Sequence, residues 1–533
     1  MLACGACINS EVNEMTTAAM LKFVSRKKRM PDKRRAEARL GDFDEIYAEF
    51  AKSEAKLQAG RCSQCGVPFC QTHCPLQNNI PDWLMLTAEN RMEEAYGVAA
   101  ATNTFPEICG RICPQDRLCE GNCVIEKGFD SVTIGAVERH ITETAFANGW
   151  VKPPKPREEL PQSVGIIGAG PAGLAAADML RRYGYQVVVY DRYDRVGGLM
   201  MYGIPSFKLE KHVVARREKL LREGGVKFVL NTDIAIAPPK ATASKNKSKN
   251  KNKVMPFAEL RDKHDAILIA TGVYQARGLN KSMLADQPEA MPIQALDYLT
   301  HSNRLGLGDK LGEGKNLDAP LNAPFNAKGK HVVVIGGGDT AMDCVRTAVR
   351  QEAKSVVCVY RRDRVNMPGS RREVMHAEEE GVRFEWLAQP VAFVSGKGKM
   401  ANKIGGIICR RNRLGLVDSS GRQSTEAVAD SDFTLKADMV ITALGFTPED
   451  LPSMFGEPRL AVREGGAIAV DWRSMMTELD GVFAAGDIVR GASLVVWAVR
   501  DGRDAADNIA QWLASKGAGQ ADADLADIKE MLA

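Results

Sequence analysis

A ladder of closely spaced cysteines between Cys62 and Cys123 constrains this chain more than any other feature. Eight of its thirteen cysteines lie there: Cys62, Cys65, Cys70, Cys74, Cys109, Cys113, Cys119 and Cys123. Proline follows directly at Cys74-Pro75 and Cys113-Pro114. Closely spaced thiolates with a terminal Cys-Pro are typical of [4Fe–4S] sites. The pattern predicts iron–sulfur ligation, and the number of cysteines is enough for two cubanes.

Three other interpretations compete with iron. A disulfide framework is disfavoured, because the chain is large and no secretory segment precedes the cysteines. Structural zinc remains open, because CxxC is a zinc spacing, although the longer spacers differ from a zinc ribbon. A core of reduced thiols would not explain the density of the ladder. Zinc is therefore the main alternative.

The length and charge of the chain limit the number of domains and the kind of partner to expect. A chain of 533 residues is too long for one core, so about three domains are expected. The net charge is +4, but residues 240–253 hold six lysines and no acid, and the balance without them is −2. The basic balance is local and does not indicate nucleic-acid binding. We expect 240–253 to be a solvated, disordered loop.

Targeting signals are not found in the sequence. No apolar run is long enough for a membrane span without Gly or Pro breaks, and residues 1–20 lack the apolar core of a signal peptide. Oxygen-sensitive clusters and free thiols favour a reducing cytoplasm. We therefore predict a cytoplasmic protein without a membrane or nucleic-acid partner.

The N-terminal third predicts a small helical domain. Residues 1–39 are interpreted as an extension followed by a basic, solvated arm over 26–39. Apolar residues at helical spacing predict one helix over 42–59, and 81–101 predicts one or two more. Residues 40–150 would then form a helical domain held by metal clusters, since clusters can replace a hydrophobic core at this size. The proline-rich stretch 151–162 is a linker.

A dinucleotide-binding fingerprint follows the linker. The strand-like SVGIIG leads into Gly168, Gly170 and Gly173, then a helix, then VVVY ending at Asp191. The glycines allow a tight turn, close approach of a pyrophosphate and close packing of helix on strand. The helix N-terminus would hold the phosphates, and Asp191 would accept from a ribose hydroxyl.

A second copy begins at Lys330. Gly336 and Gly338 follow a VVVI strand, and Ala341 takes the place of the third glycine. The second strand ends in Arg361 and Arg362 rather than in an acid. Because arginine forks bind a 2′-phosphate that an acid would repel, this half is predicted to prefer NADP over NAD. A solvated loop is the alternative for the two arginines.

Three shorter pieces complete the pattern. Residues 266–272 and 440–445 are each a strand followed by a small-residue turn, and 481–487 is a strand ending in Gly486 and Asp487. Asp487 suits a flavin ribityl or phosphate, or a helix N-cap. If a nicotinamide stacks on a flavin, 443–445 and 492–497 should line the contact. Because cofactors carry hydride chemistry, no catalytic side chain is predicted.

At several independent places the sequence resembles one known family. The motifs GAGPAG, VGGLMMYGIPSFKL, VIGGGDTAMDC, YRRD, MPGSRREV and AAGDIVRGASLVVWAVRDGRDAA, with the cysteine segment, are similar to the small (beta) subunit of bacterial NADPH-dependent glutamate synthase. The resemblance covers roughly residues 25–515. Residues 1–20, the lysine-rich stretch and part of 279–327 fall outside it.

The resemblance implies an α/β fold with a helical iron–sulfur domain and two Rossmann-like domains, for FAD and NADPH, the second inserted in the first. The expected boundaries are 1–39, 40–150, 163–320 (FAD, first part), 328–450 (NADPH) and 451–533 (FAD, second part). It further implies that NADPH reduces FAD, and that electrons pass through two [4Fe–4S] clusters to a large (alpha) subunit. That subunit makes L-glutamate from L-glutamine and 2-oxoglutarate, so a higher hetero-oligomer is expected.

The matching motifs also carry residue assignments. Cofactor contacts are expected from Gly168, Gly170, Pro171, Ala172, Gly173, Asp191, Arg192, Gly198, Leu199, Lys208, Thr271, Gly272, Gly336, Gly338, Asp339, Thr340, Ala341, Arg361, Arg362, Ala443, Gly445, Gly486, Asp487, Leu494 and Val495.

Cluster ligands follow from the related domain of dihydropyrimidine dehydrogenase. By its interleaved pattern, Cys62, Cys65, Cys70 and Cys123 would hold one cluster, and Cys74, Cys113 and Cys119 the other. The fourth ligand of the second cluster is Glu138, matching a glutamine of that enzyme, or Cys109.

Two rival functions remain at this stage. One is a free-standing NAD(P)H:ferredoxin-type oxidoreductase that uses the same modules with another acceptor. The other is a zinc-stabilised nucleotide-binding scaffold without redox activity.

Overall fold

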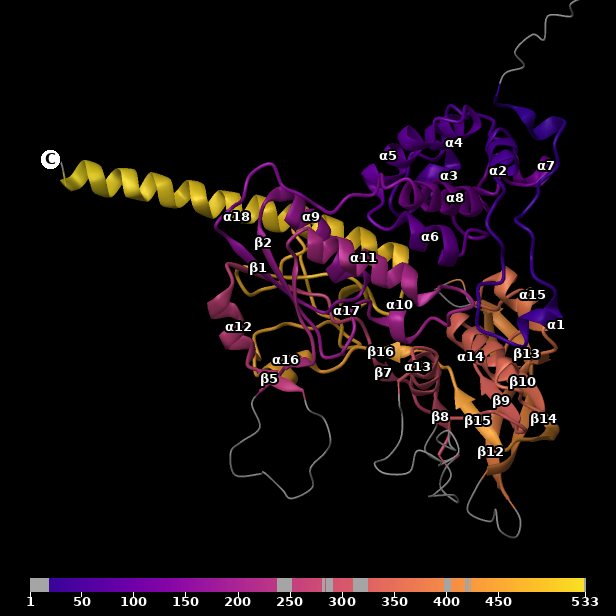
Figure 1. The fold of residues 1–533 in the computed structure, drawn as a ribbon. Helices are drawn as coiled ribbons and strands as arrows, with labels where there is room; N and C mark the ends of the chain where they lie inside the picture. The colour runs from indigo at the N-terminus through magenta and orange to yellow at the C-terminus, as the bar shows by residue number, and fades with distance from the viewer. Residues whose placement is uncertain are drawn as a thin grey trace, which may run out of the picture.

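The computed structural model describes residues 19–236, 252–279, 283, 291–309, 325–396, 404–417, 421 and 423–531, with side chains as far as 516. A helical N-terminal domain lies above two parallel sheets, each with its own helices (Figure 1). The expectations for residues 1–18, for the lysine-rich stretch up to residue 251 and for most of 280–324 lie outside the described residues.

Short helices build the N-terminal domain. Their apolar faces meet in a core around Trp83, Phe105 and Ile141, which are almost completely buried. Buried cysteines Cys62, Cys74 and Cys109 belong to the same core. The elements are η1 (Lys22–Val24), α1 (Ala36–Arg39), α2 (Lys52–Ala59), α3 (Phe69–Thr72), α4 (Ile80–Ala88), α5 (Met92–Thr102), α6 (Pro106–Ile112), α7 (Glu126–Phe129) and α8 (Ile134–Ala147).

The first sheet is parallel and has the order β17-β6-β1-β2-β3. One face is covered by α9 and α18, whose small residues pack closely on the strands and continue into the N-terminal core. The opposite face packs on α12 and α16. The strands are β1 (Ser163–Ile167), β2 (Gln186–Tyr190), β3 (Lys227–Val229), β6 (Ala266–Ile269) and β17 (Val482–Ala484); the helices are α9 (Pro171–Tyr183), α10 (Leu199–Tyr202), α11 (Lys211–Glu223), α12 (Phe257–Lys263), α16 (Leu451–Phe455), α17 (Asp487–Arg490) and α18 (Val495–Met531).

The second sheet, β11-β10-β9-β15-β8, is also parallel. Its strands are β8 (Ile293–Gln294), β9 (His331–Ile335), β10 (Ser355–Tyr360), β11 (Arg383–Trp386) and β15 (Met439–Thr442), with helices α13 (Ala295–Gly306), α14 (Asp339–Arg350) and α15 (Arg371–Glu379). Because the chain returns to the first sheet at β17, the second domain is inserted in the first, which confirms the predicted fold class.

The predicted boundary at residue 320 is wrong. Ile293 and Gln294 pair with Ile441 and Thr442, so β8 belongs to the second sheet although it precedes the fingerprint glycines. Helix α13 packs on α14 of the same domain. A two-residue strand gives too short a sequence signal to assign it to either sheet.

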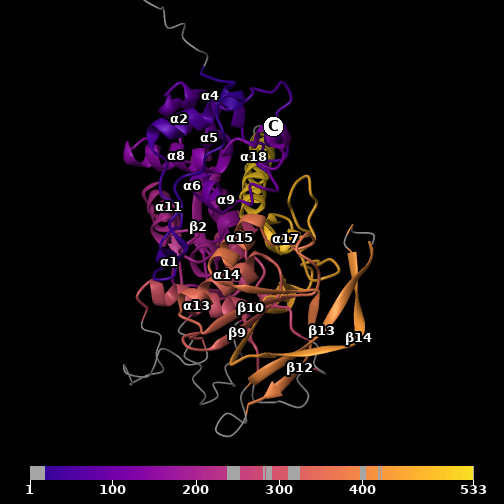
Figure 2. The same ribbon diagram turned by 90° about the vertical axis from the view of Figure 1, so that its right-hand side faces the viewer.

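Three small sheets complete the fold. A three-stranded antiparallel sheet, β12 (Ala388–Ser395), β13 (Ile404–Val417) and β14 (Gln423–Lys436), packs against the second parallel sheet and projects from it (Figure 2). The strands β7 (Gln275–Ala276) and β16 (Phe446–Thr447) pair where the chain crosses between the two domains. The last pair is β4 (Thr232–Ile234) with β5 (Lys253–Met255).

The basic segment 26–39 is not the solvated arm that its composition predicts. Arg39 is 1% exposed and its guanidinium contacts Glu379 at 2.8 Å and Glu380 at 3.2 Å in the second nucleotide domain. Residues 42–50 are not helical, and the Tyr47 hydroxyl is hydrogen-bonded to Nε2 of His376 at 2.9 Å. Lys28, Lys33 and Arg39 pair with distant acids, so 26–50 forms a strap between the N-terminal domain and α15.

Among the helices that the structure describes, none is both long and apolar enough to cross a membrane.

Candidate functional site

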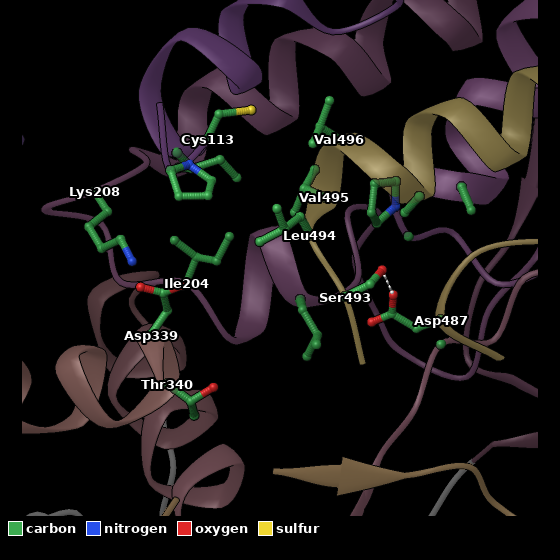
Figure 3. A pocket seen from close by; sticks show the side chains of 18 of the residues that line it. Cys113, Ile204, Lys208, Asp339, Thr340, Asp487, Ser493, Leu494, Val495 and Val496 are labelled. Carbon is green, nitrogen blue, oxygen red and sulfur yellow. Dashed lines mark hydrogen bonds between the residues drawn. The ribbon is translucent and has the colours of Figure 1, made fainter. Parts of the chain in front are cut away.

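A cavity of about 240 Å³ lies where the N-terminal domain and the two nucleotide domains meet (Figure 3). The first domain contributes its glycine turn and the start of α18, and the second contributes the start of α14. The N-terminal domain contributes the end of α6 and the following turn. Predicted site residues that line it are Gly168, Gly170, Pro171, Ala172, Asp191, Leu199, Lys208, Thr271, Gly272, Asp339, Thr340, Asp487, Leu494, Val495 and Cys113.

The first glycine turn has the geometry of a pyrophosphate site. Gly168 has φ +111°, and a Cβ there would lie 2.3 Å from the carbonyl oxygen of Ala270. A Cβ on Gly170 would meet no atom within 4 Å, so the space above it is open to a ligand. Pro171 begins α9, where its missing N–H costs nothing, and the remaining first-turn amides are free to bind anionic oxygens.

Asp191 closes the same turn from the end of β2. Its carboxylate accepts from the amides of Ala169 at 2.6 Å and Tyr193 at 2.8 Å. Burial raises its pKa, and the two amide hydrogen bonds oppose that shift. Arg192, also predicted as a cofactor contact, forms an ion pair with Glu449 (Nη1–Oε1 2.9 Å) beside the ring of Tyr274. A smaller hollow lined by Asp191, Arg192 and Tyr274 adjoins the main cavity.

The second glycine turn repeats this geometry. Gly336 has φ +143°, and a Cβ on it would lie 2.3 Å from the carbonyl oxygen of Ala443. Gly338 faces open space, and α14 begins at Asp339. Asp339 and Thr340 point into the shared cavity, and Asp339 also accepts from the amide of Ser370 at 2.9 Å. The turn therefore suits a second pyrophosphate.

Arg361 and Arg362 lie away from the cavity, at the end of β10. Arg361 is exposed and Arg362 is half-buried, with its Nε donating to the carbonyl oxygen of Gln423 at 2.6 Å. Among the described residues neither guanidinium pairs with a carboxylate, whereas the neighbouring Arg364 pairs with Glu378 at 2.7 Å. Both forks are thus available to an anion at the edge where β10 ends.

Lys208 crosses from the first nucleotide domain to the second. Its Nζ lies 2.8 Å from Asp343 and 3.9 Å from Glu373. Burial lowers the pKa of Lys208, but the two carboxylates outweigh burial and raise it. Burial likewise raises the pKa of Asp343 to about 6, against the opposing effect of Lys208. The Lys208–Asp343 ion pair thus joins the two nucleotide domains at the wall of the cavity.

Sequence reasoning missed several residues of this wall. Arg111, Ile204, Tyr274, Asp343, Arg372 and Glu373 line the cavity without having been predicted. Arg372 and Glu373 lie inside the MPGSRREV motif, so the signal was present in the sequence, but nothing in the residue types pointed to a role. Ser493, which lies within the predicted 492–497 segment, donates to Asp487 at 2.6 Å and orients that carboxylate at the start of α17.

Other predicted residues support the cavity without lining it. Gly173 and Ala341 are buried in α9 and α14, and Gly198 lies against Gly170. A Cβ on Gly486 would lie 2.9 Å from the side chain of Ala172. Ala443 and Gly445 are not part of the lining; Gly445 instead borders a separate hollow with Arg277 and Arg463. Of the expected nicotinamide contact, only the 493–496 part faces the cavity.

The cysteines fall into two spatial groups. Cys62, Cys65, Cys70 and Cys123 are close enough to perturb each other electrostatically. Cys74, Cys109, Cys113 and Cys119 lie around Glu138 in a second group. Within the described ranges no three Cys, His, Asp or Glu side chains converge as ligands of one metal ion. A cubane spreads its ligands over four irons, so both groups are compatible in composition with [4Fe–4S] ligation.

Both candidates for the eighth ligand sit in the second group. Glu138 accepts from Asn103 at 3.0 Å and from Asn78 at 3.4 Å, and burial raises its pKa to about 8. The Cys109 thiol lies 3.8 Å from the Oδ1 atom of Asn103, and it is hydrogen-bonded to Cys113. Glu138 and Cys109 therefore both lie in the second group, and each is placed to serve as its fourth ligand.

Comparisons with known proteins agree with this arrangement. Residues 39–150 match the family model for the dihydropyrimidine dehydrogenase domain II with a 4Fe–4S cluster, and residues 162–502 match the pyridine nucleotide-disulphide oxidoreductases. The class defined by fold and site is therefore an NADPH-dependent iron–sulfur flavoprotein oxidoreductase.

Named relatives narrow this class. The glutamate synthase [NADPH] small chain of Azospirillum brasilense is 57% identical over 94% of this chain and 98% of its own length. The small chain of Escherichia coli (strain K12) is 42% identical over 92% and 98%. The chain belongs to the family of glutamate synthase [NADPH] small chains. In fold alone it is also similar to FprA of Mycobacterium tuberculosis, solved in complex with NADPH (TM-score 0.51, 18% identity, 68% and 86% coverage).

Proposed function

We propose that this chain is the electron-input subunit of a glutamate synthase. It would oxidise NADPH at FAD and deliver the electrons through two [4Fe–4S] clusters to a large subunit, which forms L-glutamate from L-glutamine and 2-oxoglutarate. A hetero-oligomer working in the cytoplasm is part of this proposal. The NADPH-dependent electron-transfer role itself follows from the family and its two domains.

One observation carries the electron route. Cys113 and Pro114 line the same cavity as Gly170, Asp339 and Leu494 (Figure 3). A cysteine of the second group thus reaches the space between the two nucleotide turns. When bound there, a flavin can accept a hydride and release single electrons. The cluster held by the second cysteine group would receive those electrons first.

The first group lies on the outer side of this route. None of its four cysteines lines the cavity, whereas Cys113 of the second group does. Electrons would therefore leave through the cluster of Cys62, Cys65, Cys70 and Cys123. We assign Cys74, Cys113 and Cys119 to the inner cluster, with Glu138 or Cys109 as the fourth ligand.

The chain's own residues would position the two nucleotides. The turn at 168–173 with Asp191 and Asp487 would hold FAD, and the turn at 336–341 would hold the NADPH pyrophosphate. Arg361 and Arg362, unpaired at the end of β10, would bind the 2′-phosphate. Lys208 would keep the two nucleotide domains in register at the wall of the cavity.

Metal analysis and an anaerobic bleaching spectrum test the core of the proposal. About eight irons per chain are expected for two [4Fe–4S] clusters. The flavin should bleach rapidly with NADPH and much more slowly with NADH. Zinc without iron would overturn the electron route, and about four irons would reduce it to one cluster. A Glu138→Ala and a Cys109→Ala variant would then show which residue completes the inner cluster.

The partner is tested separately. With a glutamate synthase large subunit, the protein should support glutamate formation from glutamine and 2-oxoglutarate with NADPH. If it instead reduces a small acceptor protein such as a ferredoxin and never couples to glutamate formation, the free-standing oxidoreductase is the correct function.

A further inference from the structure

The loop 361–366, which follows β10, is tied to the three-stranded sheet that sequence reasoning did not predict. The amide of Leu387, just before β12, donates to the carbonyl oxygen of Arg362 at 3.0 Å. Arg362 in turn donates to Gln423 of β14 at 2.6 Å. Asn366 donates to the side-chain oxygen of the same Gln423 at 2.9 Å. Strands far along the chain therefore set the path of the two arginines.

Among these contacts, the hydrogen bond from Asn412 is the one that folding alone explains least. Its Nδ2 donates to the carbonyl oxygen of Arg361 at 3.1 Å, and its backbone amide donates to Leu387 at 2.7 Å. The side chain is 5% exposed, and its Oδ1 has no hydrogen-bond partner among the described residues. Burying a half-satisfied amide in a strand costs stability. An apolar residue would suit the fold better there, so the donated hydrogen bond has a role beyond folding.

A break in the β13–β14 register lies next to Asn412, with the extra residues on β14. The β13–β14 register shifts between Arg410 and Asn412, and Arg410 pairs with Asp432 on one side of the shift. Bulges redirect side chains and often occur beside functional sites. Leu387, the residue between β11 and β12 that receives the Asn412 amide, has φ +52°. Two departures from regular strand geometry thus converge on the carbonyls of Arg361 and Arg362.

We propose that Asn412 is a positioning residue for coenzyme selectivity: by fixing the Arg361 carbonyl it holds both guanidinium forks where a 2′-phosphate binds. This inference rests on the proposed NADPH site at Arg361 and Arg362. Without the Asn412 hydrogen bond, the carbonyl of the exposed Arg361 loses its contact with β13, and the two forks lose their common geometry.

The test uses binding of 2′,5′-ADP, which carries the 2′-phosphate, and of 5′-ADP, which lacks it, to the full-length protein by calorimetry. Asn412→Ala should weaken 2′,5′-ADP binding about three- to tenfold, the factor expected for one lost hydrogen bond, and leave 5′-ADP unchanged. Asn412→Asp keeps the shape but removes the donor, and should weaken binding at least as much. KM for NADPH should rise by the same factor at constant kcat.

Arg413→Ala is the matched control. Arg413 lies one residue further along β13, is exposed, and pairs with Glu426 at 2.8 Å rather than with the loop. It should change neither Kd. Equal losses for both nucleotides, or no loss in either Asn412 variant, would overturn the inference.

A double variant separates this inference from the proposal beneath it. If Arg361→Ala with Arg362→Ala leaves the ratio of the two Kd values unchanged, the proposed 2′-phosphate site itself is wrong. If the double variant abolishes the preference and the Asn412 variants do not, the coenzyme site stands and only the role of Asn412 falls.

Discussion

The two nucleotide domains are both built on five-stranded parallel sheets but carry opposite charge at one decisive place. In the first, β2 ends in Asp191, whose carboxylate is held by two backbone amides beside the glycine turn. In the second, β10 ends in Arg361 and Arg362, which pair with no carboxylate among the described residues. A shared backbone thus serves two nucleotides, and the side chains after the second strand distinguish them. An acid suits a free ribose and arginines suit a phosphorylated one.

The glycine turns differ in how tightly they pack. In the first domain a Cβ at the third position, Gly173, would lie 2.0 Å from the carbonyl oxygen of Gly168. In the second domain Ala341 occupies the matching position and is completely buried. Helix α14 therefore stands further from its turn than α9 does. The first glycine turn therefore tolerates added side-chain volume at its third position less well than the second turn does.

The largest effect is expected where one residue joins the two domains. Lys208→Met leaves the buried carboxylate of Asp343 without its cation, which should cost about 3–5 kcal/mol of stability, whereas Glu373 keeps its ion pair with Arg346. Flavin reduction should slow by the same factor with NADPH and with NADH. The substitution removes a contact between the two nucleotide domains, but it leaves the residues that select the coenzyme unchanged. Stopped-flow reduction and thermal unfolding measure the two effects. Lys219→Met, which removes an exposed lysine, should change neither.

A smaller effect should follow from exchanging the third residues of the turns. Gly173→Ala should destabilise the first domain by about 1–3 kcal/mol and lower flavin content, because α9 must move away from the turn. The reverse change, Ala341→Gly, should cost about 1 kcal/mol or less and leave flavin content unchanged. Flavin absorbance and the melting temperature report both. Normal flavin content in Gly173→Ala would contradict the difference in packing.

The smallest effect, counted per pH unit, concerns the pH dependence of stability. Lys211 is buried beside the first site, donates to the carbonyls of Met200 and Ile204, and has a pKa lowered by burial to about 7; the only opposing charge is Asp343. The unfolded chain keeps this proton up to a pKa of about 10.4. Stability should therefore rise between about pH 7 and pH 10, by at most about 1.4 kcal/mol per pH unit.

Replacing Lys211 by Met should flatten this part of the pH profile. Urea midpoints at pH 7, 8 and 9 provide the measurement, with Lys219→Met as an exposed control. Lys208 should not contribute a similar slope, because its pKa is raised rather than lowered. An unchanged slope in Lys211→Met would show that another group carries the dependence.

Local spacing explains what could be predicted. The glycine turns and Asp191 are encoded within short stretches, where spacing determines geometry directly. The grouping of the cysteines was expected only from the family resemblance, because Cys123 lies far along the chain from Cys62, Cys65 and Cys70. Arg39 could not be assigned in this way, because its partner Glu379 is 340 residues away in the sequence. The expected helix over 42–59 is correct only for Lys52–Ala59, since the apolar residues before it pack as a strap between domains. Asn412 lies next to a break in strand register that no sequence period reveals.

The position of the fifth strand in each sheet bears on the order in which the chain can be completed during its synthesis. All strands of the second sheet lie between residues 293 and 442, whereas the first sheet waits for β17 at 482–484. Until the ribosome has delivered that segment, the edge of β6 stays open, and an open edge invites wrong pairing. The domain that starts first is the last to be finished, and a nascent chain stopped before residue 482 would carry a closed second domain beside an incomplete first one.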